Sequence, residues 1–162
     1  MSSENRTNIP NSLNEHWMPF TSNKDFKKSP RLITEAKGVY LKTHHGKTQI
    51  DASSGLFCNP LGHGRKEITE AVTKQLDTLD YAQPFQQGFG GSFELATKIS
   101  KHTPGDLNKM FFTICGSTAV ETAIKIAVAY HRAKGNAHRF RFVGRERAYH
   151  GMNIGCVSVG GM

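Results

Sequence analysis

The sequence predicts an α/β chain, in which a small antiparallel sheet near the N-terminus is followed by helices and the first strands of a mostly parallel sheet. Two patterns lead to this prediction. Short alternating apolar and polar runs between residues 31 and 52 are typical of half-buried strands joined by turns. Residues 109–144 then read as a strand, a long helix and a second strand, which is the order of a parallel crossover unit. We expect an N-terminal arm and small sheet over residues 1–60, and the beginning of a larger domain over residues 61–162.

The first thirty residues are polar and rich in turn formers, and they predict no independent domain. Their one apolar group, Trp17 to Phe20, could anchor an arm. Three short strands are predicted over residues 31–52, because "GVYLK" alternates in character and "HHGK" supplies turn chemistry before the next apolar residue.

Three helices are predicted from apolar residues that recur every three or four positions. They are expected within residues 64–81, within residues 92–102, and from Ser117 to about Lys134. Gly135 stands where a glycine commonly ends a helix. Buried strands are predicted on both sides of the third helix, at residues 109–115 and 139–144.

Cysteine and hydropathy patterns narrow the class of protein. Three widely spaced cysteines without a CxxC pair suggest neither a disulfide framework nor a zinc site, and they fit a reducing cytoplasm. No signal-peptide core is visible, and no apolar run approaches the roughly 18 residues that span a bilayer. The adjacent His44 and His45 lack a matching carboxylate or cysteine, so no metal site is expected. We expect a soluble, unexported protein.

The net charge of +8 is concentrated between residues 132 and 147, where six basic residues face a single acidic one. Such a segment could attract anions, including nucleic acid. Its "RFRF" run could also stack on RNA bases. In a strand, however, alternation places both phenylalanines on one face and both arginines on the other, so a half-buried strand is the favoured interpretation.

A Gly-Ser-Thr turn at residues 116–118 leads from the expected strand into the third helix. The first N–H groups of a helix have no backbone acceptor and can hold a phosphate. The run "TAVE" also fits a capping box, with Thr118 as N-cap and Glu121 three residues later. Because neither GxxxxGK[ST] nor GxGxxG occurs, a phosphate here would depend on the helix N-terminus and a hydroxyl alone. Local chemistry by itself favours simple capping.

Three other loops carry side chains suited to a ligand site. Tyr149 and His150 follow the next expected strand and would emerge at the same sheet edge as the turn, although an isolated aromatic is more simply half-buried in a surface loop. Leu56 and Phe57 lie in a loop rich in Gly, Asn and Pro, where they could line a pocket or subunit contact, or anchor the loop to the core. The loop "YAQPFQQGFGG" is similar and carries Phe85.

Taken in order and spacing, these segments resemble the N-terminal part of class III (ω-amino acid) aminotransferases that depend on pyridoxal 5′-phosphate, most closely β-alanine–pyruvate transaminases. The resemblance begins near Asn14 and rests on "HWMPFT", "GVYLKTHHGKTQIDASSGLFCNPLGHGRKEI", "YAQPFQQGFGGSFELATKIS", "FFTICGSTAVETAIKIAVAYHRAKG" and "FVGRERAYHGMNIGCVSVGG". It implies a type I pyridoxal-phosphate fold and a homodimer. It also implies transfer of an amino group from an ω-amino acid or amine to a keto acid such as pyruvate.

The resemblance implies roles for individual residues. Gly116, Ser117 and Thr118 match the turn that holds the cofactor phosphate. Tyr149 matches the aromatic that stacks on the pyridine ring, and His150 completes that loop. Leu56 and Phe57 match a pocket-lining pair, and Phe85 matches an aromatic contributed across a dimer interface. The family usually has an acidic residue in place of Thr118, and many members have Trp in place of Phe57, which affects pocket polarity and substrate size.

No catalytic residue is assigned within the chain. In the family, the Schiff-base lysine and the carboxylate paired with the pyridinium nitrogen lie well beyond the phosphate turn, and no lysine here matches that position. The resemblance therefore implies the N-terminal portion of a subunit, inactive alone, with an incomplete core. The alternative is a truncated, non-catalytic module that binds nucleic acid or another anion through residues 132–147.

Overall fold

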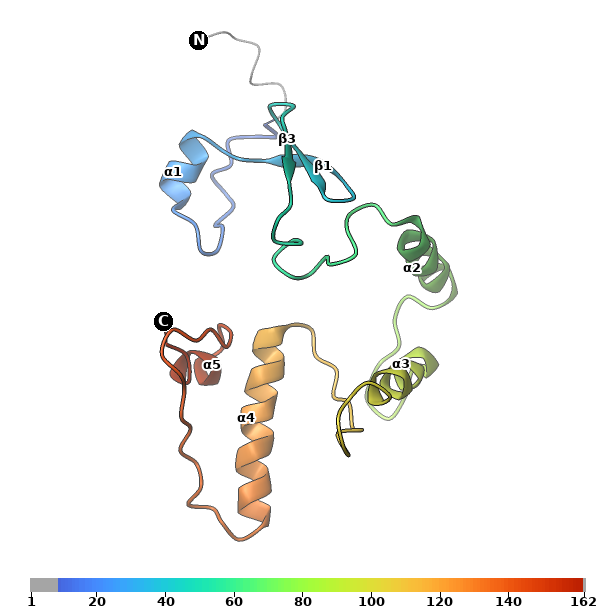
Figure 1. Cartoon of the computed structure of the whole chain (residues 1–162), viewed down its shortest axis with the longest axis vertical. Helices are drawn as coiled ribbons and strands as arrows, with labels where there is room; N and C mark the ends of the chain where they lie inside the picture. Colours follow the sequence, from blue (N-terminus) through green and yellow to red (C-terminus); the bar gives the residue numbers. More distant parts are fainter. Residues whose placement is uncertain (1–8, 162) are drawn as a thin grey trace. The chain divides into compact units, whose positions relative to one another are not determined.

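A computed structural model describes residues 9–161 of the chain, which divide into two compact units, one up to Gln83 and the other from Pro84. Each unit is described by itself. The first contains α1 (Asn23–Lys28), β1 (Ile33–Lys37), β2 (Tyr40–Thr43), β3 (Thr48–Ile50) and α2 (Lys66–Thr78), and the second contains α3 (Gly90–Ser100), α4 (Gly116–Ala133) and α5 (Ile154–Ser158) (Figure 1). The predicted domain division after residue 60 stays a prediction.

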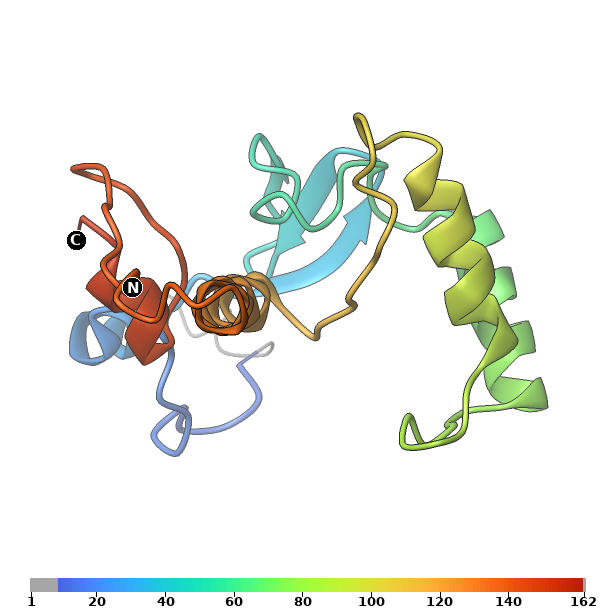
Figure 2. The same cartoon turned by 90° about the horizontal axis from the view of Figure 1, so that it is seen from below.

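The first unit is built on a three-stranded antiparallel sheet in the order β1-β2-β3. Its strands are drawn as blue to cyan arrows in Figure 2. Lys37 pairs with Tyr40 across the first turn, where Gly38 has a φ of +57°. Gly46 has a φ of +78° in the second turn, a backbone region that glycine adopts without steric cost. The three predicted strands are confirmed.

The three predicted helices are confirmed as α2, α3 and α4. The C-terminus of α4 is closed by two reversed hydrogen bonds: Gly135 N–H donates to the Arg132 carbonyl (3.0 Å) and Asn136 N–H donates to the His131 carbonyl (2.8 Å). Gly135 has a φ of +75°, so this is a Schellman motif with glycine in its left-handed position. Within residues 9–161, no helix has the length and apolar character to cross a membrane.

The two strands predicted beside α4 are wrong for the part of the chain that the structure describes. Residues 109–115 and 139–144 have no strand pairing, and Ile114 and Val143 are 95% and 99% exposed. A strand forms only where a neighbour exchanges backbone hydrogen bonds with it, and no described segment does so for either run. The expected parallel sheet is therefore not assembled among these residues.

Two short helices occur where none was expected. The polar N-terminal region contains α1, in which the Ser22 hydroxyl donates to Asp25 (2.9 Å). The apolar stretch near the C-terminus contains α5. Residues 136–150 run back along α4 and bring α5 beside its first turns (Figure 1). Because Glu121 of α4 accepts the Gly155 N–H at 3.0 Å, the first turn of α5 obtains an acceptor for its backbone N–H.

Candidate functional site

The N-terminus of α4 forms the centre of the candidate site. Cys115 is extended and the helix begins at Gly116, so the N–H groups of Gly116, Ser117 and Thr118 precede the first intrahelical donor, Ala119, which bonds to the Cys115 carbonyl at 3.0 Å. The positive end of the helix dipole is added to these three donors. This helix end therefore favours a negatively charged group.

The thiol of Cys115 lies among hydrogen-bond donors of the first turn of α4. The Thr118 hydroxyl lies 3.3 Å from Cys115 Sγ, and the backbone N–H groups of Thr118 and Ser117 also stabilise the thiolate. Together these donors, with the Thr118 hydroxyl first among them, lower the pKa of the Cys115 thiol. The lowered pKa agrees with the preference of this helix end for negative charge, which follows from its N–H groups.

The predicted capping box is wrong. The N-cap is Cys115, so Thr118 lies inside the first turn and not at the position before it. Glu121 does not fold back on the helix terminus, because its carboxylate accepts the Gly155 N–H and lies 3.9 Å from Cys156 Sγ. The pattern identified a helix start but placed it three residues late, since Gly116 and Ser117 already have helical backbone.

The loop of Tyr149 and His150 is joined to this helix end through its next two residues. Met152 N–H donates to Ser117 Oγ at 3.0 Å. Gly151 is buried with a φ of +120°, and a Cβ there would lie 2.7 Å from both Cα and Oγ of Ser117. Only glycine permits this approach. The structure thus brings Gly151 and Met152 against Ser117, although the sheet edge expected to bring the loop and the turn together is absent from the described residues.

The donor set suits a phosphate group. Ser117 Oγ accepts the Met152 N–H, and the hydroxyl keeps its own hydrogen to donate. Three backbone N–H groups lie beside it at the helix end. Tyr149 is 57% exposed and His150 is half-buried, so both rings are accessible on the neighbouring loop. The hydroxyl and the N–H groups at this helix end can donate to a phosphate.

The remaining predicted site residues lie elsewhere. Leu56 and Phe57 belong to the first unit and are 73% and 84% exposed, so neither anchors its loop within the described part of that unit. Phe85 lies in the connection before α3 and is 77% exposed.

A hydrogen-bonded group that sequence reasoning missed, Asp51, Asn59 and His63, encloses the loop of Leu56 and Phe57. The donors around Asp51, first the His63 ring and then the Gly55 N–H, lower the pKa of its carboxyl to about 2. The sequence contained one signal for this group: an acidic residue, Asp51, and a histidine, His63, lie at the two ends of a glycine-rich loop.

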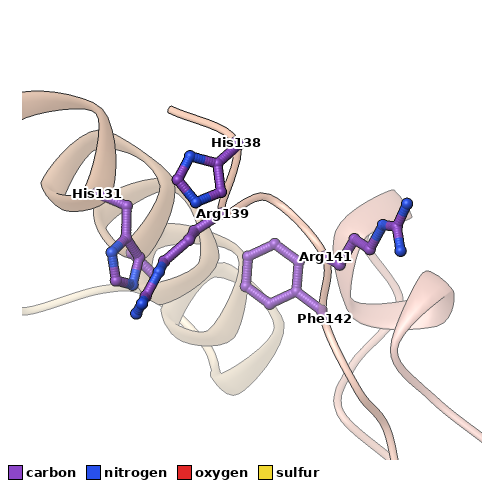
Figure 3. A pocket seen from close by; sticks show the side chains of 6 residues that line it. His131, His138, Arg139, Arg141 and Phe142 are labelled. Atoms are coloured by element: carbon purple, nitrogen blue, oxygen red, sulfur yellow. The ribbon is translucent and has the colours of Figure 1, made fainter. Parts of the chain in front are cut away.

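A basic hollow of about 400 Å³ lies near the other end of α4. It is lined by Ala127, His131, His138, Arg139, Arg141 and Phe142, and Arg139 extends toward His131 (Figure 3). His131 is fourteen residues from Ser117, which is roughly 20 Å along a helix axis. The hollow is therefore separate from the Gly-Ser-Thr turn, and it lies largely within the basic segment of residues 132–147.

Solved transaminases share the fold of the chain. An (S)-enantioselective ω-transaminase from Thermomicrobium roseum matches 93% of the chain with a TM-score of 0.89 and 31% identity. An ω-transaminase from Pseudomonas jessenii in complex with PMP matches the same share with a TM-score of 0.89 and 28% identity. Each match covers 34% of the solved chain. These structures confirm the class of protein: the fold is the N-terminal part of a pyridoxal-phosphate-dependent transaminase fold.

The family follows from the sequence comparison. The model of the family "Aminotransferase class-III" matches residues 21–162, and the chain belongs to this family of pyridoxal-phosphate enzymes. An ω-amino acid–pyruvate aminotransferase of Pseudomonas putida is 50% identical over 150 residues, covering 93% of the chain and 33% of that protein. An ω-aminotransferase of Caulobacter vibrioides is 45% identical over 152 residues, covering 94% and 35%. The chain thus spans about a third of the length of these curated relatives.

Proposed function

We propose that this chain is the N-terminal, cofactor-binding part of a transaminase that moves an amino group from an ω-amino acid or amine to a keto acid such as pyruvate. The main support is the close contact of Gly151 and Met152 with Ser117, because it joins the loop that follows Tyr149 and His150 to the N-terminus of α4. The names of the most similar relatives support the reaction and the pyruvate acceptor. The proposal includes a cytoplasmic homodimer, on the basis of the cysteine pattern and the family resemblance.

Each predicted site residue has a role in this proposal. Gly116, Ser117 and Thr118 donate to the phosphate of pyridoxal 5′-phosphate, and Tyr149 stacks on its ring with His150 beside it. The cofactor, when bound, supplies the electron-withdrawing ring on which the amino group is transferred. The proposed lining of the amine pocket is Leu56, Phe57 and, across a dimer interface, Phe85.

The proposal assigns no catalytic lysine to these 162 residues, and the chain alone is expected not to transaminate. The chain matches about a third of each relative, which supports the proposal that the catalytic lysine lies outside these 162 residues. Turnover of an amine and pyruvate by the purified chain without any added sequence would contradict this part of the proposal.

Binding of the cofactor to the chain tests the phosphate site directly. We expect Ser117→Ala to weaken binding of pyridoxal 5′-phosphate about tenfold or more, because a hydrogen bond to a charged group contributes roughly 1.5–3 kcal/mol. Binding of pyridoxal, which lacks the phosphate, should not change. Ser100→Ala, at the end of α3, is the matched control. Equal weakening of both ligands would place the phosphate elsewhere.

A second candidate function, binding of nucleic acid or another anion, is supported by the basic hollow beside His131 and Arg139. Binding of a single-stranded oligonucleotide should then weaken steeply as salt rises. Arg139→Ala should lower the salt slope by about one if the guanidinium contacts a phosphate. Binding that does not respond to salt or to this variant would exclude the candidate.

A further inference from the structure

The loop of Leu56 and Phe57 contains a left-handed helical turn. Four consecutive residues, Ser54 to Phe57, have φ values of +51°, +59°, +56° and +69°. The turn is closed by the Phe57 N–H, which donates to the Ser53 carbonyl (2.9 Å), and by the Asn59 N–H, which donates to the Ser54 carbonyl (2.8 Å). Three of the four residues carry a Cβ, for which this conformation is sterically unfavourable. Such a turn persists only where its surroundings impose it.

Apolar packing does not impose it. Leu56 and Phe57 are 73% and 84% exposed, so the two largest side chains of the turn have little contact with the described part of the first unit. The polar atoms on its inner side must therefore hold the backbone.

Asp51 is the centre of those polar atoms. Its side chain is only 6% exposed and follows β3 directly. One carboxylate oxygen accepts the N–H (3.2 Å) and the hydroxyl (3.1 Å) of Ser53, and the other accepts the Gly55 N–H (2.8 Å) from inside the turn. The same oxygen accepts from His63 Nε2 at 2.9 Å.

His63 connects this carboxylate to the far end of the loop and to the sheet. Because an ionised carboxylate only accepts, the ring hydrogen lies on Nε2 and Nδ1 is left to accept from Asn59 Nδ2 at 2.8 Å. The His63 backbone exchanges two hydrogen bonds with Gly38 in the β1–β2 turn, at 2.8 and 2.9 Å. Both ends of the loop are thus attached to the sheet.

We propose that Asp51, Asn59 and His63 are positioning residues that hold the left-handed turn and thereby fix where Leu56 and Phe57 stand in the amine pocket. The pocket role of these two side chains rests on the proposed function. The positioning itself rests on the hydrogen bonds and backbone angles of the first unit alone. The two can therefore be tested separately.

Amide hydrogen exchange of the 162-residue chain tests the positioning. In Asp51→Asn the amide cannot replace the charged acceptor, and exchange of the Phe57 and Asn59 amides should become about tenfold faster or more. Exchange at Asn136, in the α4 terminus, should not change. Asp77→Asn on the exposed face of α2 is the matched control. Unchanged exchange at Phe57 in a folded variant would overturn the proposal.

A rescue variant and a second variant distinguish loss of the turn from general misfolding of the chain. Ser54→Gly in the Asp51→Asn background should restore part of the protection, because glycine adopts the left-handed region without steric cost. His63→Phe, which removes both ring hydrogen bonds, should produce the same acceleration. In the native chain, nitrogen NMR should find the His63 hydrogen on Nε2, and a hydrogen on Nδ1 alone would overturn the network.

Kinetic measurements on the complete transaminase distinguish the positioning role of Asp51 from the proposed transaminase function. We expect Asp51→Asn to raise the KM for a bulky amine donor about tenfold, because a displacement near 1 Å has large kinetic effects, while cofactor affinity stays unchanged. If the native enzyme binds the cofactor and turns over, but Asp51→Asn leaves the KM for the amine unchanged, the positioning role is overturned and the proposed function is not. A native enzyme without transaminase activity would instead overturn the proposed function.

Discussion

At the scale of single residues, the candidate site depends on contacts that no single motif contains. Ser117 is held by Met152, thirty-five positions later in the chain, and Gly151 fills a space in which a side chain cannot fit. Ser117 and Gly151 are both small, which allows their two backbone segments to approach closely. The sequence predicted that the two segments emerge at one sheet edge, but it did not predict that Met152 bonds to Ser117 or that Gly151 packs against it.

Gly151→Ala should weaken both the fold of the second unit and cofactor binding. Its Cβ would lie 2.7 Å from Ser117 atoms, and the backbone φ of +120° is unfavourable for alanine. We expect a loss of about 1–3 kcal/mol in the free energy of unfolding, the usual cost of overpacking, measured by chemical denaturation. Gly90→Ala, which has open space around its Cβ, is the control and should have little effect.

The pH response of the first unit should follow Asp51. Its carboxyl has a pKa of about 2 in the folded chain against an ordinary value of 3.8, chiefly because of the His63 ring. A lowered folded pKa means that the stabilisation is complete above the ordinary value and is lost as pH falls toward 2. NMR signals of Gly55 and Phe57 should therefore move between about pH 4 and pH 2. In Asp51→Asn this transition should vanish, and its persistence would assign it to another group.

At the scale of elements, those that depend on local sequence could be predicted, and those that need distant partners could not. The helices α2, α3 and α4 were predictable, because a helix satisfies its own backbone and its apolar period lies within one segment. The antiparallel sheet was predictable, since short turns join its strands. Residues 109–115 and 139–144 have the side-chain pattern of strands, but a strand needs partners that the pattern does not identify.

The helix α5 depends on α4, and this dependence is testable. Glu121 accepts the Gly155 N–H, and Cys156 is fully buried against α4 with its Sγ 3.2 Å from the Ser117 carbonyl. Glu121→Ala removes a charged acceptor, so α5 should detach more often and Cys156 should be alkylated faster. Glu70→Ala, on α2, should leave the alkylation rate unchanged. Equal rates in both variants would show that α5 is held by other contacts.

At the scale of the whole molecule, the described residues bury very little apolar surface. Among residues 9–161, the buried hydrophobic residue is Cys156, and the periodic apolar face of α2 stays 47–56% exposed at Ile68, Val72 and Leu76. This confirms the expectation of an incomplete core. It agrees with the match to about a third of each relative, because an amphipathic helix is stabilised mainly by what covers its apolar face.

The exposed apolar face predicts how the isolated chain behaves. We expect it to bind the dye ANS and to self-associate as concentration rises, because large exposed apolar patches favour association. Leu76→Lys places a charge on that face and should reduce both effects, measured by fluorescence and sedimentation. Lys74→Arg, elsewhere on α2, is the control. A chain that stays monomeric and binds no ANS would contradict this expectation.

The sequence by itself determined the helices α2, α3 and α4, the antiparallel sheet, the family and the residues proposed for the cofactor. These depend on local periodicity, turn chemistry and an ordered set of motifs. Only the tertiary structure decided which atoms join the α4 N-terminus to the Gly151 loop, that Glu121 accepts a hydrogen bond from α5 and does not cap α4, and that Asp51 and His63 bond to each other beside a left-handed turn. Each of these joins residues distant in the chain or depends on backbone angles, and neither property is encoded in a local pattern of side chains.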